Sequence, residues 1–271
     1  QRAGFVAEFA ESSEIQRTKS HRRKSCDFRY GSKHESGLMI QGKKILITGG
    51  AGFIGTHMAQ RLVADNQLTL LDIDLSGPIR HSPLANDERV RKIEGDVRVY
   101  DQIAPLVAES DIVLHYASIL GVKKVIDHAR ETIDTILAGT QNVLEAARHN
   151  PRIERLVNIS TSEVYGNVMD ATEGAAASVG TGNDARLSYA SAKLMGEHLV
   201  WAYHRDFKMP TVIVRPFNIY GPLRTASNAV GVFCVKAAAG KDVTLHGDGS
   251  QLRSWCYIDD FCDAMMGCIE K

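Results

Sequence analysis

The chain of 271 residues is long enough to bury a large hydrophobic core, and it suits one α/β domain or one domain with a small additional lobe. Its 32 basic and 32 acidic residues cancel, so no net charge attracts nucleic acid or an anionic membrane surface. No apolar run approaches the roughly 20 residues that a membrane-spanning helix needs. We therefore predict neither nucleic acid nor a membrane as a partner.

The first 41 residues differ from the rest of the chain. They are polar, lack a periodic apolar pattern and carry the basic cluster His21–Lys24. No apolar stretch of signal-peptide length follows a charged start. We interpret residues 1–41 as a leader or tag-like arm that precedes a native start near Met39, and a functional basic arm is the alternative.

The five cysteines form no CxxC pair, and their odd number and scatter favour reduced thiols in a cytoplasmic protein. We predict no metal site.

From Lys44 onward, short apolar strands alternate with helical patterns. Strands are predicted at residues 45–47, 68–71, 90–94, 111–115, 153–159 and 211–214, and the long helical patterns cover residues 53–64, 122–149 and 188–207. Buried strands that are separated by helices predict a parallel sheet covered on both faces. We expect an α/β fold, with a Rossmann-type doubly wound parallel sheet and a small C-terminal substrate-binding lobe.

The first chemical signal is ITGGAGFIG, Ile47 to Gly55. It matches the G-x-G-x-x-G template directly after a strand and at the start of a helix, which is the context that a dinucleotide site requires. Glycines let the backbone turn sharply and approach a pyrophosphate at the helix N-terminus. The cofactor-binding residues predicted from this turn are Gly49, Gly52, Phe53, Ile54 and Gly55.

An acidic residue at the end of the next strand favours NAD over NADP. Asp72 lies about 20 residues after the glycines, where a carboxylate accepts the ribose hydroxyls and repels a 2′-phosphate. Asp74 is a rival for this role, because it points the same way on a strand. Asp96, with Val97 beside it, is predicted to meet the adenine edge, although Asp96 could equally be a helix cap or turn residue.

The second signal is SYASAK, which contains Tyr189 and Lys193. Residues at i and i+4 share one face of a helix. An ammonium near a phenol stabilises the phenolate and lowers the phenol pKa, so we expect Tyr189 to act as a general base that Lys193 assists.

These motifs resemble the extended short-chain dehydrogenases/reductases, specifically the members that modify nucleotide sugars. From about Lys43 the chain carries them in family order: TGGAGFIG, Asp72, HYAS, STSEVYG, YASAK, RPFNIYGP and GDGSQLRSWCYIDD. The resemblance implies a catalytic Thr161, cofactor contacts from Tyr116 and Ala117, a nucleotide-diphosphate cleft near Asn218, and Arg253 aimed at the substrate. Because parallel sheets bind ligands beyond the carboxyl ends of their strands, Ser162 and Glu163 should face the sugar, and we list Glu163 as catalytic.

Three reactions of this family fit in outline. dTDP-glucose 4,6-dehydratases usually carry an acid where this chain has Ser162, and 4-epimerases usually carry a small or neutral residue where it has Glu163. The Thr-Ser-Glu trio and Arg186 resemble UDP-glucuronate decarboxylases (UDP-xylose synthases), which are our first choice. GDP-mannose 4,6-dehydratases share the trio but favour NADP. Two departures from the family are the ASAKL sequence after Tyr189 and Ile136, which stands where an Asn is usual.

For the domains we expect the NAD-binding Rossmann unit with the catalytic residues at 42–215. The substrate-binding portion at 216–271 is interleaved with it and is predicted to be incomplete, because the family usually continues several dozen residues further. The family also implies a homodimer that pairs its long helices. A non-catalytic dinucleotide-sensing module is the alternative from another class, and the intact Thr161, Tyr189 and Lys193 favour the enzyme.

Overall fold

The computed structural model describes residues 5–9, 40–166, 171–224, 228–245 and 247–270. A parallel sheet of seven strands forms its centre, in the order β1-β7-β6-β5-β2-β3-β4. The strands are β1 (Phe5–Phe9), β2 (Lys44–Thr48), β3 (Gln67–Asp72), β4 (Val90–Glu94), β5 (Ile112–His115), β6 (Arg155–Ile159) and β7 (Thr211–Pro216). The predicted Rossmann-type fold is confirmed.

The central strands form because their apolar runs are buried on both faces of the sheet. All four residues of β5 are buried, as are the last four of β2 and β6. Continuous burial of this kind is typical of parallel strands covered by helices on both sides. Strand β2 pairs with β3 on one side and β5 on the other, so the chain reverses its direction across the sheet there, and such a switch point opens a ligand crevice at the carboxyl ends.

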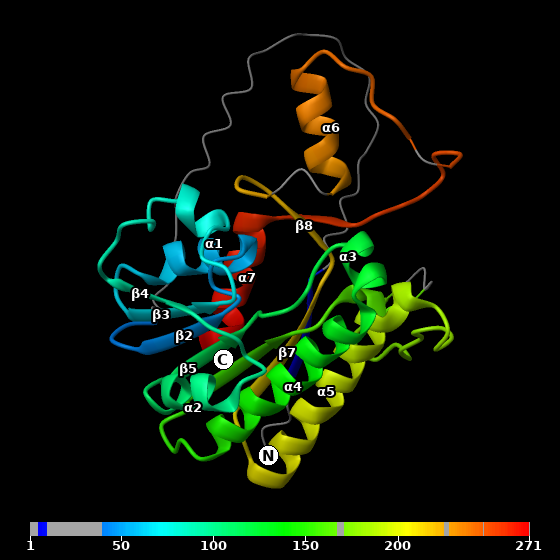
Figure 1. The fold of residues 1–271 in the computed structure, drawn as a ribbon. Coiled ribbons are helices and arrows are strands. Elements are labelled where there is room, and N and C mark those ends of the chain that lie inside the picture. The colour runs from blue at the N-terminus through cyan, green and yellow to red at the C-terminus, as the bar shows by residue number, and fades with distance from the viewer. Residues whose placement is uncertain (1–4, 10–39, 167–170, 225–227, 246, 271) are drawn as a thin grey trace.

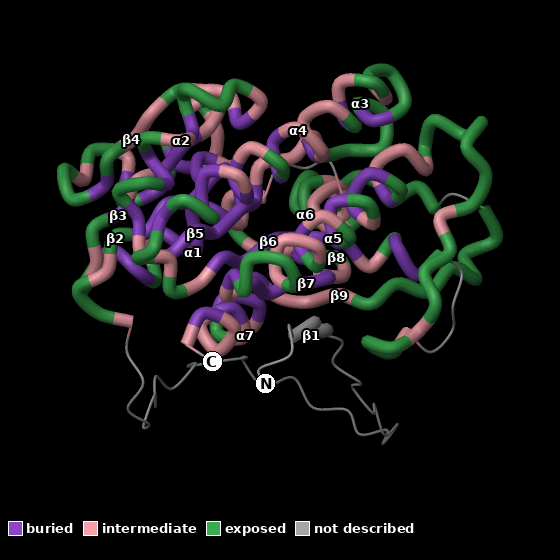
Figure 2. The backbone as a smooth tube through the Cα atoms, turned by 90° about the horizontal axis from the view of Figure 1, so that it is seen from below, coloured by how far each residue is buried: buried purple, intermediate pink, exposed green. Residues whose placement is uncertain are grey.

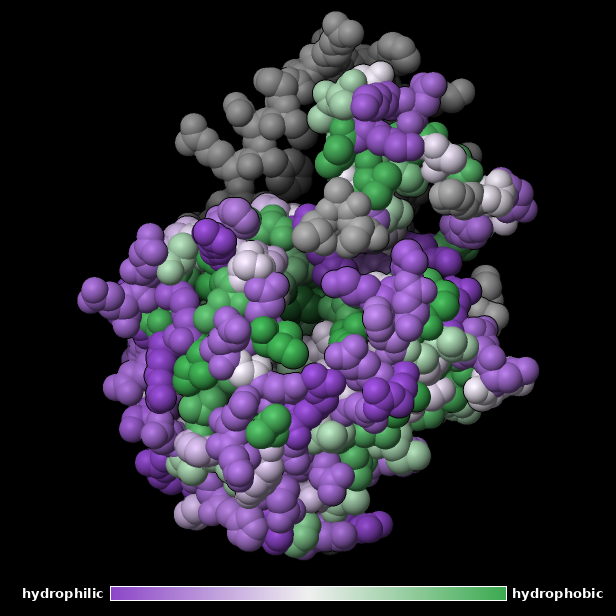
Figure 3. All heavy atoms as spheres, in the orientation of Figure 1, coloured by the Kyte–Doolittle hydropathy of each residue, from purple (hydrophilic) through white to green (hydrophobic). Residues whose placement is uncertain are grey.

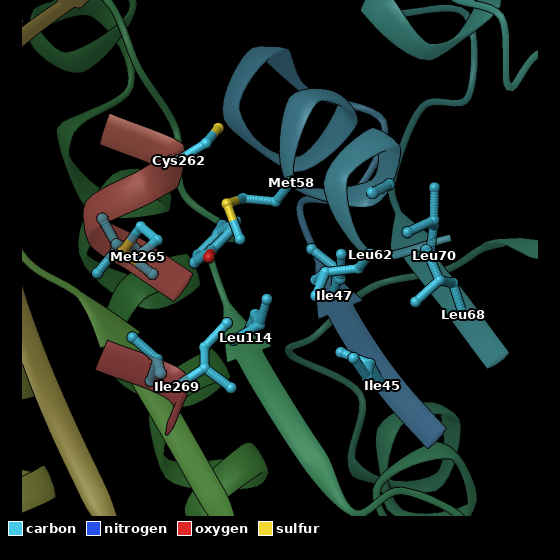
Figure 4. Close-up of a cluster of buried hydrophobic side chains, with 14 of the residues drawn as sticks. Ile45, Ile47, Met58, Leu62, Leu68, Leu70, Leu114, Cys262, Met265 and Ile269 are labelled. Atoms are coloured by element: carbon cyan, nitrogen blue, oxygen red, sulfur yellow. The ribbon is translucent and has the colours of Figure 1, made fainter. Parts of the chain in front are cut away.

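Two layers of helices enclose the sheet (Figure 1). Helices α1 (Phe53–Leu62) and α7 (Ile258–Glu270) contribute to one buried apolar cluster. Helices α2 (Tyr100–Ala108), α4 (Ala129–Arg148) and α5 (Ser188–Phe207) contribute to a second cluster. Figure 2 shows the buried positions concentrated along the strands. In Figure 4, Cys262, Met265 and Ile269 of α7 approach Met58 of α1 and Leu114 of β5.

The pattern that predicted one helix at residues 122–149 belongs to two helices, α3 (Val122–Asp127) and α4. His128 separates them, because its backbone at φ −131° and ψ 44° lies outside the helical region. The Thr132 hydroxyl donates a hydrogen bond to the His128 carbonyl, 3.0 Å away. That carbonyl also accepts from the Thr132 backbone N–H, so the break leaves the first turn of α4 intact.

A second, two-stranded parallel sheet lies beyond the end of β7. It pairs β8 (Asn218–Tyr220) with β9 (Trp255–Tyr257), and α6 (Ala229–Ala238) projects above the body between them in sequence (Figure 1). Short helices occupy Pro78–His81, Ser162–Tyr165 and Ala185–Leu187. Within the described parts of the chain, no helix combines the length and apolar character needed to cross a bilayer.

Within the arm predicted at residues 1–41, strand β1 adds to the open edge of β7, starting at the pair Phe5–Val212. The sequence pattern gave no sign of this strand. Residues 1–4 and 10–39, which include the basic cluster and Met39, lie outside the described residues. The division of the chain at residue 215 stays a prediction.

Candidate active site

The glycine turn joins β2 to α1 and leaves no room for side chains. Gly49 has a φ of 67°, and a Cβ there would lie 2.8 Å from the Ala117 backbone nitrogen. A Cβ at Gly55 would lie 2.5 Å from the Gly49 carbonyl oxygen. Gly52 caps α1, whose first turn carries no acidic residue. The open backbone N–H groups of this helix therefore favour an anion such as a pyrophosphate.

Asp72 belongs to the same crevice, and Asp74 does not. The Asp72 carboxylate accepts a hydrogen bond from the Ala51 backbone N–H at 3.0 Å, inside the glycine turn. Burial raises the pKa of Asp72, although backbone hydrogen bonds from Asp74, Ala51 and Ile73 act in the opposite direction. The Asp74 carboxylate instead accepts from the Ser76 backbone N–H at 2.7 Å and is exposed. The structure thus favours Asp72 as the ribose ligand.

The other predicted cofactor residues differ in whether their side chains or only their backbone atoms are accessible to a cofactor. Asp96 is half-buried and forms an ion pair with Arg98 at 2.6 Å, and the hydrogen bond from Arg98 lowers its pKa. The side chains of Val97 and Tyr116 are buried in the core. Only the backbone of Tyr116 and Ala117 borders the turn, directly against Gly49. The predicted Tyr116 contact can therefore come from its backbone and not from its phenol.

These features fit NAD. The glycine turn leaves space that any Cβ would fill, and a dinucleotide pyrophosphate needs such a close approach to the backbone. The Asp72 carboxylate beside the turn can accept the ribose hydroxyls. Gly49, Gly52, Phe53, Ile54 and Gly55 would hold the pyrophosphate, and Asp72 the ribose.

We expect NAD to bind much more tightly than NADP, because the Asp72 carboxylate repels a 2′-phosphate and no described arginine pairs with it. Calorimetric titration of the protein with each cofactor measures the difference. The Asp72→Asn variant should narrow the gap, and equal affinity of the wild type for both cofactors would contradict the prediction.

Thr161 and Tyr189 come together from β6 and α5. Thr161 directly follows β6, and its hydroxyl accepts a hydrogen bond from the Glu163 backbone N–H at 3.3 Å, which starts the short helix. Tyr189 is the second residue of α5. Hydrogen bonds join the Tyr189 phenol to the hydroxyls of Thr161 and Ser118. The predicted pair is therefore assembled, and Ser118 from the end of β5 joins it.

The net shift of the Tyr189 pKa is opposite to the prediction from sequence. Burial and the charge of Glu163 raise the pKa, and they outweigh the lowering by Thr161, Ser118 and Arg224. Lys193 lies on the same face, with its Nζ 5.9 Å from the centre of the Tyr189 ring. However, its ammonium donates to the Ile159 carbonyl at 2.7 Å. Burial lowers the pKa of Lys193 to about 8, so its ammonium character weakens just above neutral pH.

A buried ion pair connects the ends of β6 and β7 to helix α5, which carries Tyr189. Arg215, at the end of β7, donates two hydrogen bonds to Glu197, at 2.9 Å and 2.6 Å. Ser160, which precedes Thr161, donates a further hydrogen bond to Glu197. Glu197 follows Lys193 by one helical turn on α5. The pair therefore fixes the ends of β6 and β7 against the helix that carries Tyr189 and Lys193.

The remaining predicted substrate residues are more exposed. Ser162 is half-buried at the start of the short helix, and the charge of Arg186 partly offsets the rise that desolvation gives the pKa of Glu163. Asn218 donates to the Ser254 carbonyl at 3.1 Å. Arg253 is exposed and donates to the Leu252 carbonyl. No described hydrogen bond or ion pair connects Asn218 or Arg253 to the Tyr189 group, and their role as substrate ligands stays a prediction.

The sequence reasoning missed two residues of the group, Ser118 and Arg224. Ser118 ends the HYAS motif that supported the resemblance, and Arg224 follows the RPFNIYGP motif by two positions. Both positions were thus adjacent to recognised motifs, but only the folded chain places them near Tyr189. In Figure 3 the surface is hollowed below the segment that carries α6, and apolar residues gather around the opening.

The model of the NAD dependent epimerase/dehydratase family matches residues 45–271. The chain is 35% identical over 235 residues to a UDP-N-acetyl-alpha-D-glucosaminuronate decarboxylase of Bacillus cytotoxicus, covering 84% of this chain and 72% of the relative. It is 32% identical over 231 residues to a dTDP-glucose 4,6-dehydratase of Streptomyces niveus, covering 82% and 67%.

A solved structure is similar to the fold described above. It is a UDP-glucuronic acid 4-epimerase from Bacillus cereus in complex with UDP-glucuronic acid and NAD, with a TM-score of 0.74 and 31% identity, covering 84% of this chain and 73% of that one. The relatives thus include a decarboxylase, a dehydratase and an epimerase, all of them enzymes. The chain belongs to the NAD dependent epimerase/dehydratase family, as an enzyme with NAD as its cofactor.

Proposed function

We propose that this protein decarboxylates UDP-glucuronate to UDP-xylose, or to the 4-keto pentose if that intermediate is released early. The observation that carries the proposal is the Thr161-Ser162-Glu163 trio beside Tyr189. It offers a hydroxyl for the sugar and places Ser162 where a dehydratase needs an acid. The 35% identity to a decarboxylase of a related sugar acid supports the same reaction class.

The chain's own residues account for the proton transfer at the C4 hydroxyl. NAD, when bound, would supply a positive charge and the means to take a hydride from the sugar C4 and return it. Tyr189 takes the proton of the C4 hydroxyl while Thr161 holds that hydroxyl. The hydrogen bonds of Thr161 and Ser118 and the charge of Arg224 act to stabilise the phenolate that this step needs. Tyr189 then gives the proton back to the C4 oxygen.

The loss of carbon dioxide needs little help from side chains. A 4-keto group lies β to the C5 carboxylate, so the C5–C6 bond can break as its electrons enter an enolate. Protonation at C5 completes the step. The absence of an acid at Ser162 is therefore compatible with decarboxylation, whereas elimination of the 6-hydroxyl needs a proton donor for the leaving group.

Carbon dioxide release decides the reaction. Incubation of the protein and NAD with UDP-glucuronate should release one carbon dioxide per sugar consumed, and mass spectrometry should find UDP-xylose or its 4-keto form. UDP-glucose, which lacks the carboxylate, serves as the control. The formation of UDP-galacturonate or of a 4-keto-6-deoxy sugar without carbon dioxide would refute the proposal.

A second candidate is 4-epimerisation of UDP-glucuronate. The similarity to the Bacillus cereus 4-epimerase favours it, and the same Tyr189 chemistry would serve. The product distinguishes the two reactions, because epimerisation keeps the mass of the sugar and decarboxylation does not.

We expect a homodimer. Helices α4 and α5 lie side by side (Figure 1) and expose large apolar side chains, including Ile133, Met195 and Trp201. Apolar groups on adjacent helices favour a self-complementary interface. Light scattering at micromolar concentration should give twice the mass of one chain, and the Trp201→Glu variant should shift it toward one chain. A wild-type mass of a single chain would contradict the expectation.

A further inference from the structure

Arg224 lies in a strained turn that directly follows β8. Its backbone N–H donates to the Gly221 carbonyl at 3.3 Å, directly after β8. The preceding residue, Leu223, has a φ of 65°. A left-handed backbone is uncommon for leucine and costs free energy, and such strain clusters at functional sites.

The guanidinium of Arg224 is partly buried and forms no ion pair with an acidic residue in the described part of the chain. Its Cζ lies 5.2 Å from the centre of the Phe53 ring. Its Nε is buried and no described residue accepts a hydrogen bond from it. Arg215 also has a buried Nη1 without a described partner, but its charge is paired with Glu197 through two hydrogen bonds. Because a partly buried cation without a counter-ion is costly, a guanidinium in this position favours a ligand that supplies the acceptor.

The surroundings of Arg224 show which ligand it faces. Phe53 is the first residue of α1, next to the glycine turn. The charge of Arg224 also lowers the pKa of Tyr189, so the guanidinium lies within electrostatic reach of the base. It therefore lies near both the first turn of α1 and Tyr189. The exposed Arg186 and Arg253 have no comparable enclosure.

We propose that Arg224 is a specificity-determining residue that pairs with the C5 carboxylate of the sugar. The inference rests on the proposed function for the identity of the sugar. The carboxylate is on the carbon next to C4, whose hydroxyl meets Tyr189, while the diphosphate is on C1 across the ring. A guanidinium binds a carboxylate with two parallel hydrogen bonds, and the free Nε is one of the donors that this geometry uses.

Binding measured without turnover tests this assignment. In a Tyr189→Phe background saturated with NAD, calorimetry gives the Kd of UDP-glucuronate and of UDP-glucose. Arg224→Gln should weaken UDP-glucuronate by roughly tenfold or more, the size expected for a lost charge-assisted hydrogen bond, and UDP-glucose by less than about twofold. Arg224→Lys, which keeps the charge but not the fork, should fall between the wild type and Arg224→Gln.

The controls separate this inference from structural damage and from the proposed function. Arg91→Gln, on an exposed arginine of β4 that pairs with Glu109, should leave both affinities unchanged. If Arg224→Gln weakens the binding of both nucleotide sugars equally, Arg224 contacts the diphosphate and the assignment is wrong. The assignment is also wrong if Arg224→Gln weakens the binding of neither. Selective weakening sustains it even if the wild type releases no carbon dioxide. Conversely, if the wild type releases carbon dioxide but Arg224→Gln does not selectively weaken UDP-glucuronate binding, the proposed function stands and only the role of Arg224 is wrong.

Discussion

Tyr189→Phe should lower kcat by at least about 10²–10⁴-fold, the range for the loss of a general base. The change removes only the phenol oxygen, which the hydroxyls of Thr161 and Ser118 contact. The ring stays in place near Lys193. Affinity for the nucleotide sugar should therefore change little. Steady-state turnover of UDP-glucuronate, or of whichever nucleotide sugar the wild type consumes, measures the effect.

Tyr203→Phe is the matched control on the same helix. The Tyr203 hydroxyl donates to Glu145 at 2.9 Å, at the far end of α5, and its loss should leave kcat within about twofold. A Tyr189→Phe variant with more than about one tenth of the wild-type kcat would show that another group is the base.

The wild-type pH profile provides a second check on Tyr189. Because the pKa of Tyr189 is raised, only a small fraction of the phenol is ionised near neutral pH, and that fraction grows as the pH rises. The kcat of the wild type should therefore increase between about pH 6 and 8. The residual activity of Tyr189→Phe should lack this increase.

Glu197→Ala should destabilise the protein by about 3–5 kcal/mol, because it leaves the Arg215 charge buried without its carboxylate. The Glu197 and Arg215 side chains are 4% and 10% exposed. Ser160 also loses its hydrogen-bond acceptor. Denaturant unfolding, followed with two probes to test for a single transition, gives the free energy of unfolding.

An exposed ion pair is the control for Glu197→Ala. Glu109 and Arg91 pair at 3.2 Å with side chains 64% and 58% exposed, so Glu109→Ala should cost less than about 1 kcal/mol. Replacing both buried partners, as in Glu197→Leu with Arg215→Met, should restore much of the stability, since neither charge is then left alone. A Glu197→Ala variant as stable as the Glu109→Ala variant would contradict the assigned cost.

The local parts of the fold could be predicted because they depend on neighbours in sequence. The strands β2, β3, β5, β6 and β7 appear as short apolar runs, the glycine turn as its spacing, and the Tyr189–Lys193 pair as the period of a helix. The three-residue strands β8 and β9 escaped prediction, since runs this short carry no period. Helix α2 also escaped, because Pro105 inside it normally argues against a helix.

By itself, the sequence determined the parallel order of strands and helices from β2 onward, the glycine turn with Asp72 on the next strand, and the shared helix face of Tyr189 and Lys193. Each of these is specified by side-chain periodicity or by backbone freedom within a few residues. Only the tertiary structure decided the net pKa of Tyr189, the Glu197–Arg215 pair and the position of Arg224. Burial and Coulomb interactions depend on distances between segments that are far apart in the chain, and those distances exist only once the sheet and its helices have packed.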